Sequence, residues 1–201
     1  LLPINPKKEQ LKNAYYKNTE IGKVGYYALT KKDDVKVELT CSERVAFHQY
    51  TFPDNGAQVY VDLQHGLRFL FDEQSQQGLV IESDVKIENN TTISGFCATQ
   101  NWVSRKYYFT ITFDQPFINL NHLDPKPKDK VPKYLLDFTL ANNKILKVKI
   151  ALSSVAVDGA KLNMQTEIPH WNFEKVYQSN LASWATYLDK INIEAPLKQM
   201  E

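Results

Sequence analysis

Alternating apolar and polar residues dominate the middle of this chain of 201 residues. Residues 106–113 show the pattern most clearly, because Tyr107, Phe109 and Phe113 fall on one face of an extended strand and the residues between them on the other. The segments predicted as short strands are 34–40, 58–63, 79–81, 85–87, 92–98, 106–113, 135–140 and 144–152. Many short strands of this kind are typical of an antiparallel β-sandwich, so the predicted fold class is all-β.

Turn-forming residues mark two of the predicted strand connections. Residues 53–56, Pro-Asp-Asn-Gly, predict a turn before the strand at 58–63. The strands at 135–140 and 144–152 are predicted to form a hairpin around residues 141–143, since asparagine tolerates the positive φ of a tight turn.

Two segments have no strand period and are expected to be loops. Residues 7–23 are polar with scattered tyrosines. Residues 117–133 contain Pro125, Pro127 and Pro132 among several lysines, and this proline content argues against a central strand. The lysines could steer an anion, but a solvated surface loop is the favoured interpretation.

The apolar period changes to three and four residues near the carboxyl end. One stripe is formed there by Phe173, Val176, Tyr177, Leu181, Trp184 and Leu188. A stripe this large, followed only by a short polar tail, indicates a helix that packs on a part of the protein beyond this chain. We therefore divide the chain into a β-sandwich at residues 1–168 and a linker helix at 169–201 that leads to a further domain.

Composition narrows the functional classes. Hydrophobic residues make up 43% and aromatic residues 12% of the chain, which is ample for a core. The net charge is only +1 and no basic stripe is interleaved with aromatic residues, so nucleic acid is not an expected partner. The apolar runs are far too short for a membrane span, and the first residues lack the pattern of a signal peptide. Cys41 and Cys97 fit neither a zinc spacing nor a disulfide framework and are interpreted as buried small residues.

No motif for catalysis or metal binding stands out. The four histidines are far apart in the sequence, and neither a nucleophile elbow nor a phosphate-binding loop is present. Asp62, Glu82, Asp84 and Glu88 include residue types from which a glycosidase could draw its pair of carboxylates. Their spacing selects no pair, so the sequence assigns no catalytic residue and no metal ligand.

Several segments nevertheless resemble one known family in both order and spacing. They are Gly25-Tyr26-Tyr27, Val37-Glu38-Leu39-Thr40, residues 43–53 ending in His-Gln-Tyr-Thr-Phe-Pro, Val61-Asp62-Leu63-Gln64-His65, Ile93-Ser94-Gly95-Phe96, residues 154–160 and Glu167-Ile168-Pro169-His170-Trp171-Asn172-Phe173. Together they are similar to the amino-terminal domain of glycoside hydrolase family 92, the calcium-dependent exo-acting α-mannosidases. The chain departs from the family pattern in three places: Gln49 replaces an arginine, His170 replaces a glycine, and residues 11–22 lack the motif often found before Gly25-Tyr26-Tyr27.

The resemblance implies an amino-terminal β-sandwich of the galactose-mutarotase-like, super-sandwich type, a linking helix and then an (α/α)6 catalytic domain. It implies an inverting mechanism on mannose-containing glycans, with the acid, the base and the calcium ligands all in the catalytic domain. No catalytic residue, metal ligand or cofactor is therefore expected on this chain, which is predicted to be inactive alone. The family also implies a protein that is secreted, periplasmic or held at the outer surface of a bacterium.

Individual residues can be weighed within this hypothesis. Trp102, in a predicted loop, and His65, after a predicted strand, are the candidates for substrate contact, although packing of Trp102 against the sandwich is favoured. His48 is interpreted as a hydrogen-bonded core or interface residue. The candidates for the domain interface are Trp171, Phe173, Tyr177, Trp184 and Leu188. Two alternatives stay open: an autonomous carbohydrate-binding module, and a sandwich that serves only in protein interaction or adhesion.

Overall fold

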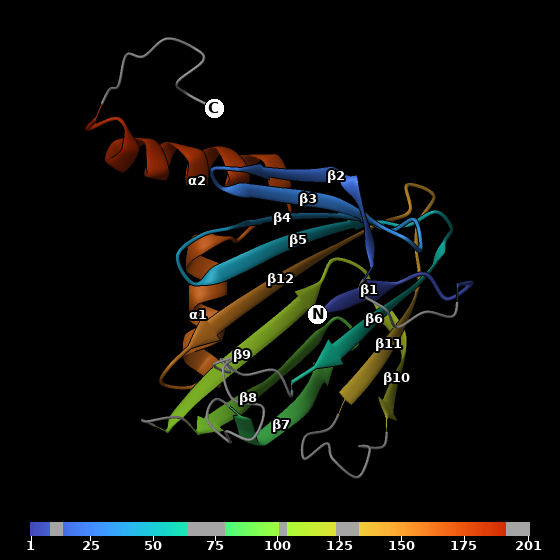
Figure 1. The fold of residues 1–201 in the computed structure, drawn as a ribbon. Coiled ribbons are helices and arrows are strands. Elements are labelled where there is room, and N and C mark those ends of the chain that lie inside the picture. The colour runs from blue at the N-terminus through green and yellow to red at the C-terminus, as the bar shows by residue number, and fades with distance from the viewer. Residues whose placement is uncertain (9–13, 64–78, 101–103, 124–132, 192–201) are drawn as a thin grey trace.

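The computed structural model describes residues 1–8, 14–63, 79–100, 104–123 and 133–191 (Figure 1). The strands are β1 (Leu2–Ile4), β2 (Tyr15–Lys23), β3 (Tyr26–Lys31), β4 (Lys36–Cys41), β5 (Val45–Thr51), β6 (Gly56–Asp62), β7 (Leu79–Asn89), β8 (Thr92–Gln100), β9 (Arg105–Phe113), β10 (Phe117–Leu123), β11 (Lys133–Thr139) and β12 (Ile145–Ser153). Two helices follow, α1 (Val157–Glu167) and α2 (Phe173–Leu188).

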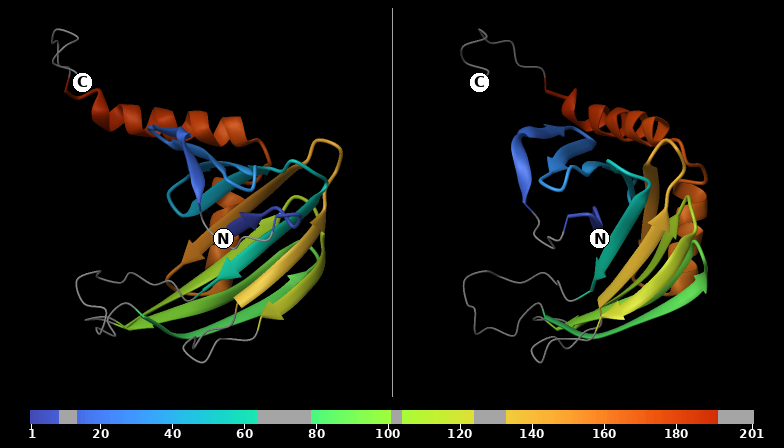
Figure 2. Two further views of the ribbon diagram at one scale, coloured as in Figure 1. Left: turned by 45° about the vertical axis from the view of Figure 1, so that its right-hand side comes forward. Right: turned by 90° about the vertical axis from the view of Figure 1, so that its right-hand side faces the viewer.

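The strands form two antiparallel sheets that face each other across a core (Figures 1 and 2). The larger sheet has the order β2-β3-β4-β5-β12-β9-β8-β7 and the smaller one β1-β6-β11-β10. Side chains of alternating strand positions fill the space between them, including Val37, Tyr50, Val59, Ile111, Phe113, Leu136, Phe138 and Val148. The predicted all-β antiparallel sandwich is confirmed.

Both helices lie on the outer face of the larger sheet, away from the smaller sheet (Figure 2). Helix α1 contacts mainly β12 and β9, and α2 contacts β4 and β5. A second apolar cluster forms between this face and the helices from Val45, Phe47, Ala151, Ala160, Met164, Ile168, Phe173 and Val176. The larger sheet is therefore covered on both faces where α1 and the start of α2 cross it.

The predicted hairpin at 135–140 and 144–152 is wrong. Strand β11 pairs with β6 and β10 in the smaller sheet, whereas β12 pairs with β5 and β9 in the larger one. The chain therefore crosses between the sheets at residues 140–144, and the positive φ of 56° belongs to Lys144 and not to an asparagine. Alternation of apolar residues specifies which face of a strand is buried, but it does not specify the neighbouring strand.

The two predicted loops were only partly correct. Residues 15–23 of the first form β2, an edge strand whose register with β3 shifts between Tyr16 and Ile21. Residues 117–123 of the second form β10, also at a sheet edge, while its prolines lie outside the described residues. No residue of β2 or β10 is fully buried, so neither strand has the clear apolar alternation of a core strand.

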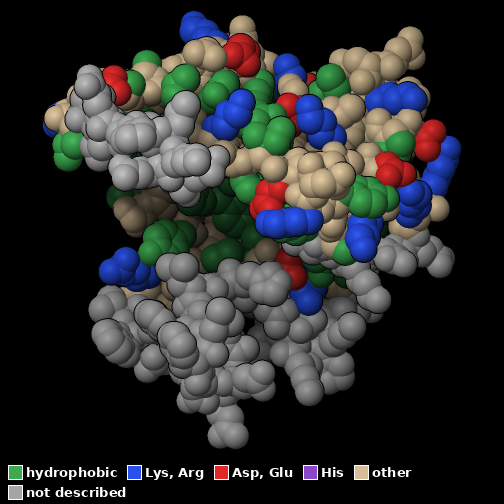
Figure 3. Space-filling model, turned by 45° about the horizontal axis from the view of Figure 1, so that its top comes forward, with side chains coloured by type: hydrophobic (Ala, Val, Ile, Leu, Met, Phe, Trp, Pro, Cys, Tyr) green, Lys and Arg blue, Asp and Glu red, His purple; other side chains and the backbone are tan. Residues whose placement is uncertain are grey.

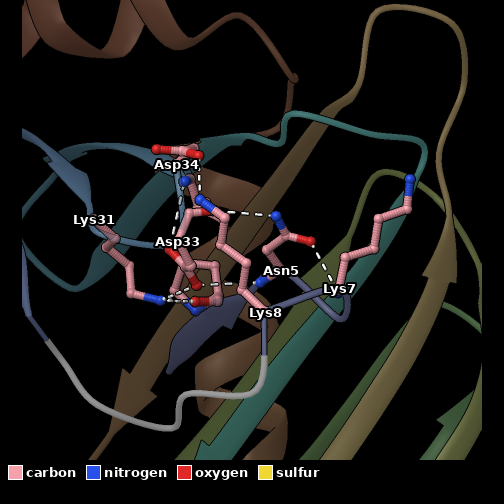
Figure 4. A network of polar contacts seen from close by, with 8 residues as sticks. Asn5, Lys7, Lys8, Lys31, Asp33 and Asp34 are labelled. Carbon is pink, nitrogen blue, oxygen red and sulfur yellow. Dashed lines mark hydrogen bonds and ion pairs between the residues drawn. The ribbon is translucent and has the colours of Figure 1, made fainter.

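A buried polar network ties the amino end to the larger sheet (Figure 4). The Lys31 ammonium and the Asp33 carboxylate are 2.8 Å apart, and the two side chains are only 2% and 6% exposed. Lys31 also donates to the carbonyl of Pro3, and the backbone N–H of Asn5 donates to Asp33 at 3.2 Å. Since Pro3 is in β1 of the smaller sheet and Asp33 follows β3 of the larger, the network links the two sheets.

Candidate functional site: the outer surface of helix α2

The first turns of α2 are anchored on the sheet. The Asn172 side chain accepts a hydrogen bond from the backbone N–H of Lys175 at 3.0 Å and so caps the helix. Phe173 and Val176 are 8% and 6% exposed. The Phe173 ring packs edge-on against Phe47 of β5, with ring centroids 5.5 Å apart. This half of the helix is part of the fold of the sandwich.

The last turns of α2 expose their large side chains. Trp184, Tyr187 and Leu188 are 51%, 65% and 51% exposed, and Ile191 beyond the helix is 76% exposed. Figure 3, which brings the top of the view in Figure 1 forward, shows apolar side chains mixed with basic and acidic ones. Exposed apolar groups rimmed by charges are typical of interaction surfaces.

A groove of about 810 Å³ runs along this helix beside the end of α1 and the β4–β5 turn. Trp184 and Tyr187 line it from the helix, while Cys41 and Glu167 line it from the sandwich. The Asn180 amide crosses between these walls and donates to the carbonyl of Cys41 at 2.7 Å. Asn180 therefore holds the middle of α2 to the sheet at the point where exposure begins.

Glu167, which lines the groove together with Glu43, is held by groups of the β4–β5 turn. Its carboxylate accepts hydrogen bonds from the Ser42 hydroxyl at 2.6 Å and from the backbone N–H of Arg44 at 3.0 Å, and it pairs with the Arg44 guanidinium at 2.5 Å. Burial opposes ionisation, but these donors outweigh it and hold the pKa of Glu167 below its usual value. This geometry suits a structural anchor that joins α1 to the sheet.

A second hollow of about 510 Å³ lies between α2 and the strands β2 to β5. Glu38, a partly buried acidic residue that lines it, accepts from the Tyr26 hydroxyl at 2.8 Å and the Gln49 amide at 3.2 Å, and pairs with Lys36 at 3.0 Å. Burial opposes ionisation of Glu38, but the three donors hold its pKa below the usual value. Burial and the bond to Glu38 raise the pKa of Tyr26 to about 12. This carboxylate, too, is engaged in holding neighbouring strands together.

His48 has a partner within the sandwich. Its Nδ1 lies 2.6 Å from the Tyr50 hydroxyl, and the two rings meet edge to face. Burial lowers the pKa of His48 to about 3, so the imidazole is neutral at ordinary pH. The contact agrees with the favoured interpretation of His48 as a hydrogen-bonded core or interface residue.

The structure separates the predicted site residues into three groups. Trp102 and His65 lie outside the described residues, so their proposed contact with substrate stays a prediction. Trp171, Phe173 and Tyr177 contact aromatic residues of this chain's own sheet or lie beside them. Trp184 and Leu188 are exposed. A role for these five at a domain interface stays a prediction, with Trp184 and Leu188 the more accessible members.

The four candidate carboxylates lie on strands of two different sheets. Asp62, on β6, lies 3.9 Å from the ammonium of Lys133. Glu88, on β7, accepts from the Ser94 hydroxyl at 2.6 Å, and this bond with the pairing to Lys161 lowers its pKa. Glu82 and Asp84 are exposed on β7, at the edge of the larger sheet. The sequence analysis missed Glu167 and Glu38 as anchors. The partners of Glu167 come from a distant segment, and those of Glu38 are brought to it by the pairing of neighbouring strands.

The described residues contain neither a cluster of metal-binding side chains nor a membrane-spanning helix. Among them, no three or more histidine, cysteine, aspartate or glutamate side chains are grouped so as to hold a metal ion, so no calcium ligand is assigned there. In the same part of the chain, no helix combines the length and the apolar character needed to cross a membrane.

Comparison with known proteins gives the family. Residues 2–153 match the profile of the glycosyl hydrolase family 92 N-terminal domain. A family GH92 alpha-mannosidase from Bacteroides thetaiotaomicron superposes with a TM-score of 0.78 at 25% identity, over 90% of this chain and 26% of that one. A family GH92 inverting mannosidase from the same species shares the fold, with a TM-score of 0.73 at 18% identity over 90% of this chain and 24% of its own.

A curated relative agrees with these structures. An uncharacterized secreted glycosidase of Arthroderma benhamiae is 26% identical over 194 residues, which cover 85% of this chain and 25% of that protein. The chain thus spans about a quarter of the length of the relatives that it matches. The match over residues 2–153 shows that this chain belongs to the glycosyl hydrolase family 92 N-terminal domain family.

Proposed function

We propose that this chain is the non-catalytic amino-terminal domain of a longer exo-α-mannosidase that acts on mannose-containing glycans. The observation that carries the proposal is the match of residues 2–153 to the family's N-terminal domain, in relatives about four times as long. The exposed apolar end of α2 supports it, because Trp184, Tyr187 and Leu188 offer a surface on which a further domain can pack.

In this proposal the chemistry takes place outside the chain. An inverting glycosidase needs one carboxylic acid to protonate the leaving oxygen and one carboxylate to activate water on the opposite face of the sugar. Glu167 and Glu38, which line the two hollows beside Glu43 and Glu174, are instead engaged by structural hydrogen bonds. The domain's contribution is to support the catalytic barrel and the edge of the substrate pocket. The proposed calcium ion is assigned to the catalytic domain, and no step through it is assigned here.

Secretion is part of the same proposal. The relative from Arthroderma benhamiae is described as secreted, which supports secretion of the longer protein. A location in the bacterial periplasm or at the outer surface stays a prediction from the sequence.

An activity assay tests the enzyme proposal. The chain of 201 residues is expected to release no aryl group from an aryl α-mannoside, with or without added calcium, whereas the full-length protein is expected to do so. NMR of the released mannose should show an inverted anomer, and chelation should reduce the rate. Turnover by the purified chain alone, or none by the full-length protein, would overturn the proposal.

One observation favours a second candidate, an autonomous carbohydrate-binding module. The exposed Trp184 and Tyr187 rings line the groove of about 810 Å³, and aromatic faces of this kind can stack on sugar rings. A glycan array probed with the chain and with Trp184→Ala separates the two candidates. Binding of mannose-containing glycans that is lost in Trp184→Ala supports the module, and no binding by the chain supports the enzyme domain.

A further inference from the structure

The connection between the two helices is held unusually firmly. Ile168, which ends α1, is fully buried, and the Trp171 ring packs edge-on against Phe47 of β5 at a centroid distance of 5.9 Å. Only Pro169 and His170 separate these two anchors. A connecting segment normally runs over the surface and moves more than the elements it joins. This one is pressed onto the sheet at both ends.

Lys149 of β12 contacts this connection from the sheet on which it packs. The residue is only 6% exposed, and its ammonium donates to the carbonyl of Ile168 at 3.0 Å while lying 4.2 Å from the centre of the Trp171 ring. A buried ammonium is costly unless its environment satisfies it, and burial lowers the pKa of Lys149. A methionine of similar length could fill the same space without that cost. What the lysine adds is a directed contact with both ends of the connection.

Lys147 makes a parallel contact two residues earlier on the same strand. Since side chains alternate along a strand, Lys147 and Lys149 point to the same face of β12. The Lys147 ammonium donates to the carbonyl of Trp171 at 2.9 Å. Lys149 and Lys147, on the outer face of the larger sheet, therefore donate hydrogen bonds to the carbonyl groups of residues 168 and 171, just before α2 begins.

The strand that carries these lysines is paired with a neighbouring strand on each side. Strand β12 lies inside the larger sheet, paired with β5 on one side and β9 on the other. Ala151, next on the same face, is fully buried beneath the helices. Strand β12 therefore holds the connection that leads into α2, while Phe173 and Asn180 hold the helix itself to β5 and β4.

We propose that Lys147 and Lys149 are positioning residues that lock the α1–α2 connection into a rigid joint and so fix the direction of α2. Building on the proposed function, the joint sets the orientation of the catalytic domain relative to the sandwich. Neither lysine is proposed to touch substrate. Their effect on turnover passes through the placement of the domain that follows α2.

A distance measurement on the chain tests the joint without any reference to activity. The direction of α2 is measured between two nitroxide labels, in a background with both natural cysteines replaced. One label is on Ala182→Cys, on the exposed side of α2, and the other is on Asn90→Cys, in the β7–β8 turn. The parent chain should give one narrow distance distribution by pulsed EPR. Lys149→Met and Lys147→Met should broaden or shift it, whereas Lys86→Met, whose side chain is 71% exposed, should leave it unchanged.

The outcomes are decisive in either direction. An unchanged distribution in both Lys149→Met and Lys147→Met overturns the proposal. If Lys149→Met fails to fold by circular dichroism, Lys147→Met alone decides. A second arm measures the same variants in the full-length protein, where a lower kcat with little change in KM is expected. A broadened distance distribution with unaltered turnover would support the rigid joint but contradict the proposed support of the catalytic domain. Failure of the joint and failure of the proposed function therefore give different results.

Discussion

The two halves of α2 carry one continuous apolar stripe, yet they have different surroundings. At the start of the helix Phe173 and Val176 are buried against β5 and its neighbours. At its end Trp184 and Leu188 remain about half exposed. Hydrophobic periodicity identifies a helix face that must be covered, but it does not say which part of the protein covers it. The first half therefore stabilises this domain, and we propose that the second half serves a partner.

The largest expected effect comes from truncating the aromatic residue in each half of the helix. Phe173→Ala should lower the free energy of unfolding of the chain by about 3–5 kcal/mol, as other buried Phe→Ala changes do. Trp184→Ala should change it by only about 0.5 kcal/mol, because an exposed side chain loses little on truncation. Urea unfolding followed by circular dichroism measures both. Equal losses would mean that the two halves contribute alike to this fold.

Two ion pairs near the amino end allow the same comparison between a buried and an exposed interaction. Replacing Asp33 by alanine leaves the buried Lys31 ammonium without its carboxylate and should cost about 3 kcal/mol. Asp54→Ala removes the partner of Lys7 in a pair whose side chains are 69% and 40% exposed, and should cost about 0–1 kcal/mol. Thermal unfolding of the two variants measures the difference. A loss for Asp54→Ala as large as that for Asp33→Ala would contradict the buried network as the tie between the sheets.

Glu167 should show its role through pH. Its pKa is lowered in the fold, so the unfolded chain takes up a proton first as the pH falls, and stability is lost from about pH 4.5 down through the folded pKa. Glu167→Gln should cost about 1–2 kcal/mol at pH 7, since bonds to a charged acceptor are replaced by weaker ones. The difference from the parent should shrink towards pH 3. A difference that stays constant from pH 7 to pH 3 would rule out the carboxylate charge as its cause.

The smallest expected effect lies at the boundary between the two halves. Asn180→Ala removes the 2.7 Å hydrogen bond to the carbonyl of Cys41 and should cost about 1 kcal/mol. Gln178→Ala, on an exposed turn of the same helix, serves as the matched control and should cost less. Chemical unfolding of both variants gives the comparison. An equal cost would show that Asn180 does not hold the middle of the helix.

The sequence predicts those elements whose apolar residues face a core. The alternation at 106–113 became β9, with Phe109, Ile111 and Phe113 buried, and the stripe from Phe173 onward became α2. Strand β2 escaped prediction because none of its residues is fully buried. Helix α1 was not recognised because Ala160 and Met164 are its only buried residues, too few to form a stripe.

Pairing and polar anchoring could not be predicted in the same way. The apolar alternation at 135–140 and 144–152 fits a hairpin and a crossing between sheets equally well, so only the fold decides between them. Lys149 falls on the polar positions of its strand and is expected to face solvent. Its burial depends on the carbonyl of Ile168 and the ring of Trp171, which the fold alone brings above β12.

Hydrogen–deuterium exchange along α2 tests the central claim most directly. The amides of residues 181–188 are compared in the isolated chain and in the full-length protein, with residues 173–176 as the internal reference. We predict that the reference turns are protected in both, whereas the turns around Trp184 exchange quickly in the chain and become protected in the full-length protein. Equal exchange of residues 181–188 in both proteins would contradict the claim that this half of the helix packs on a further domain.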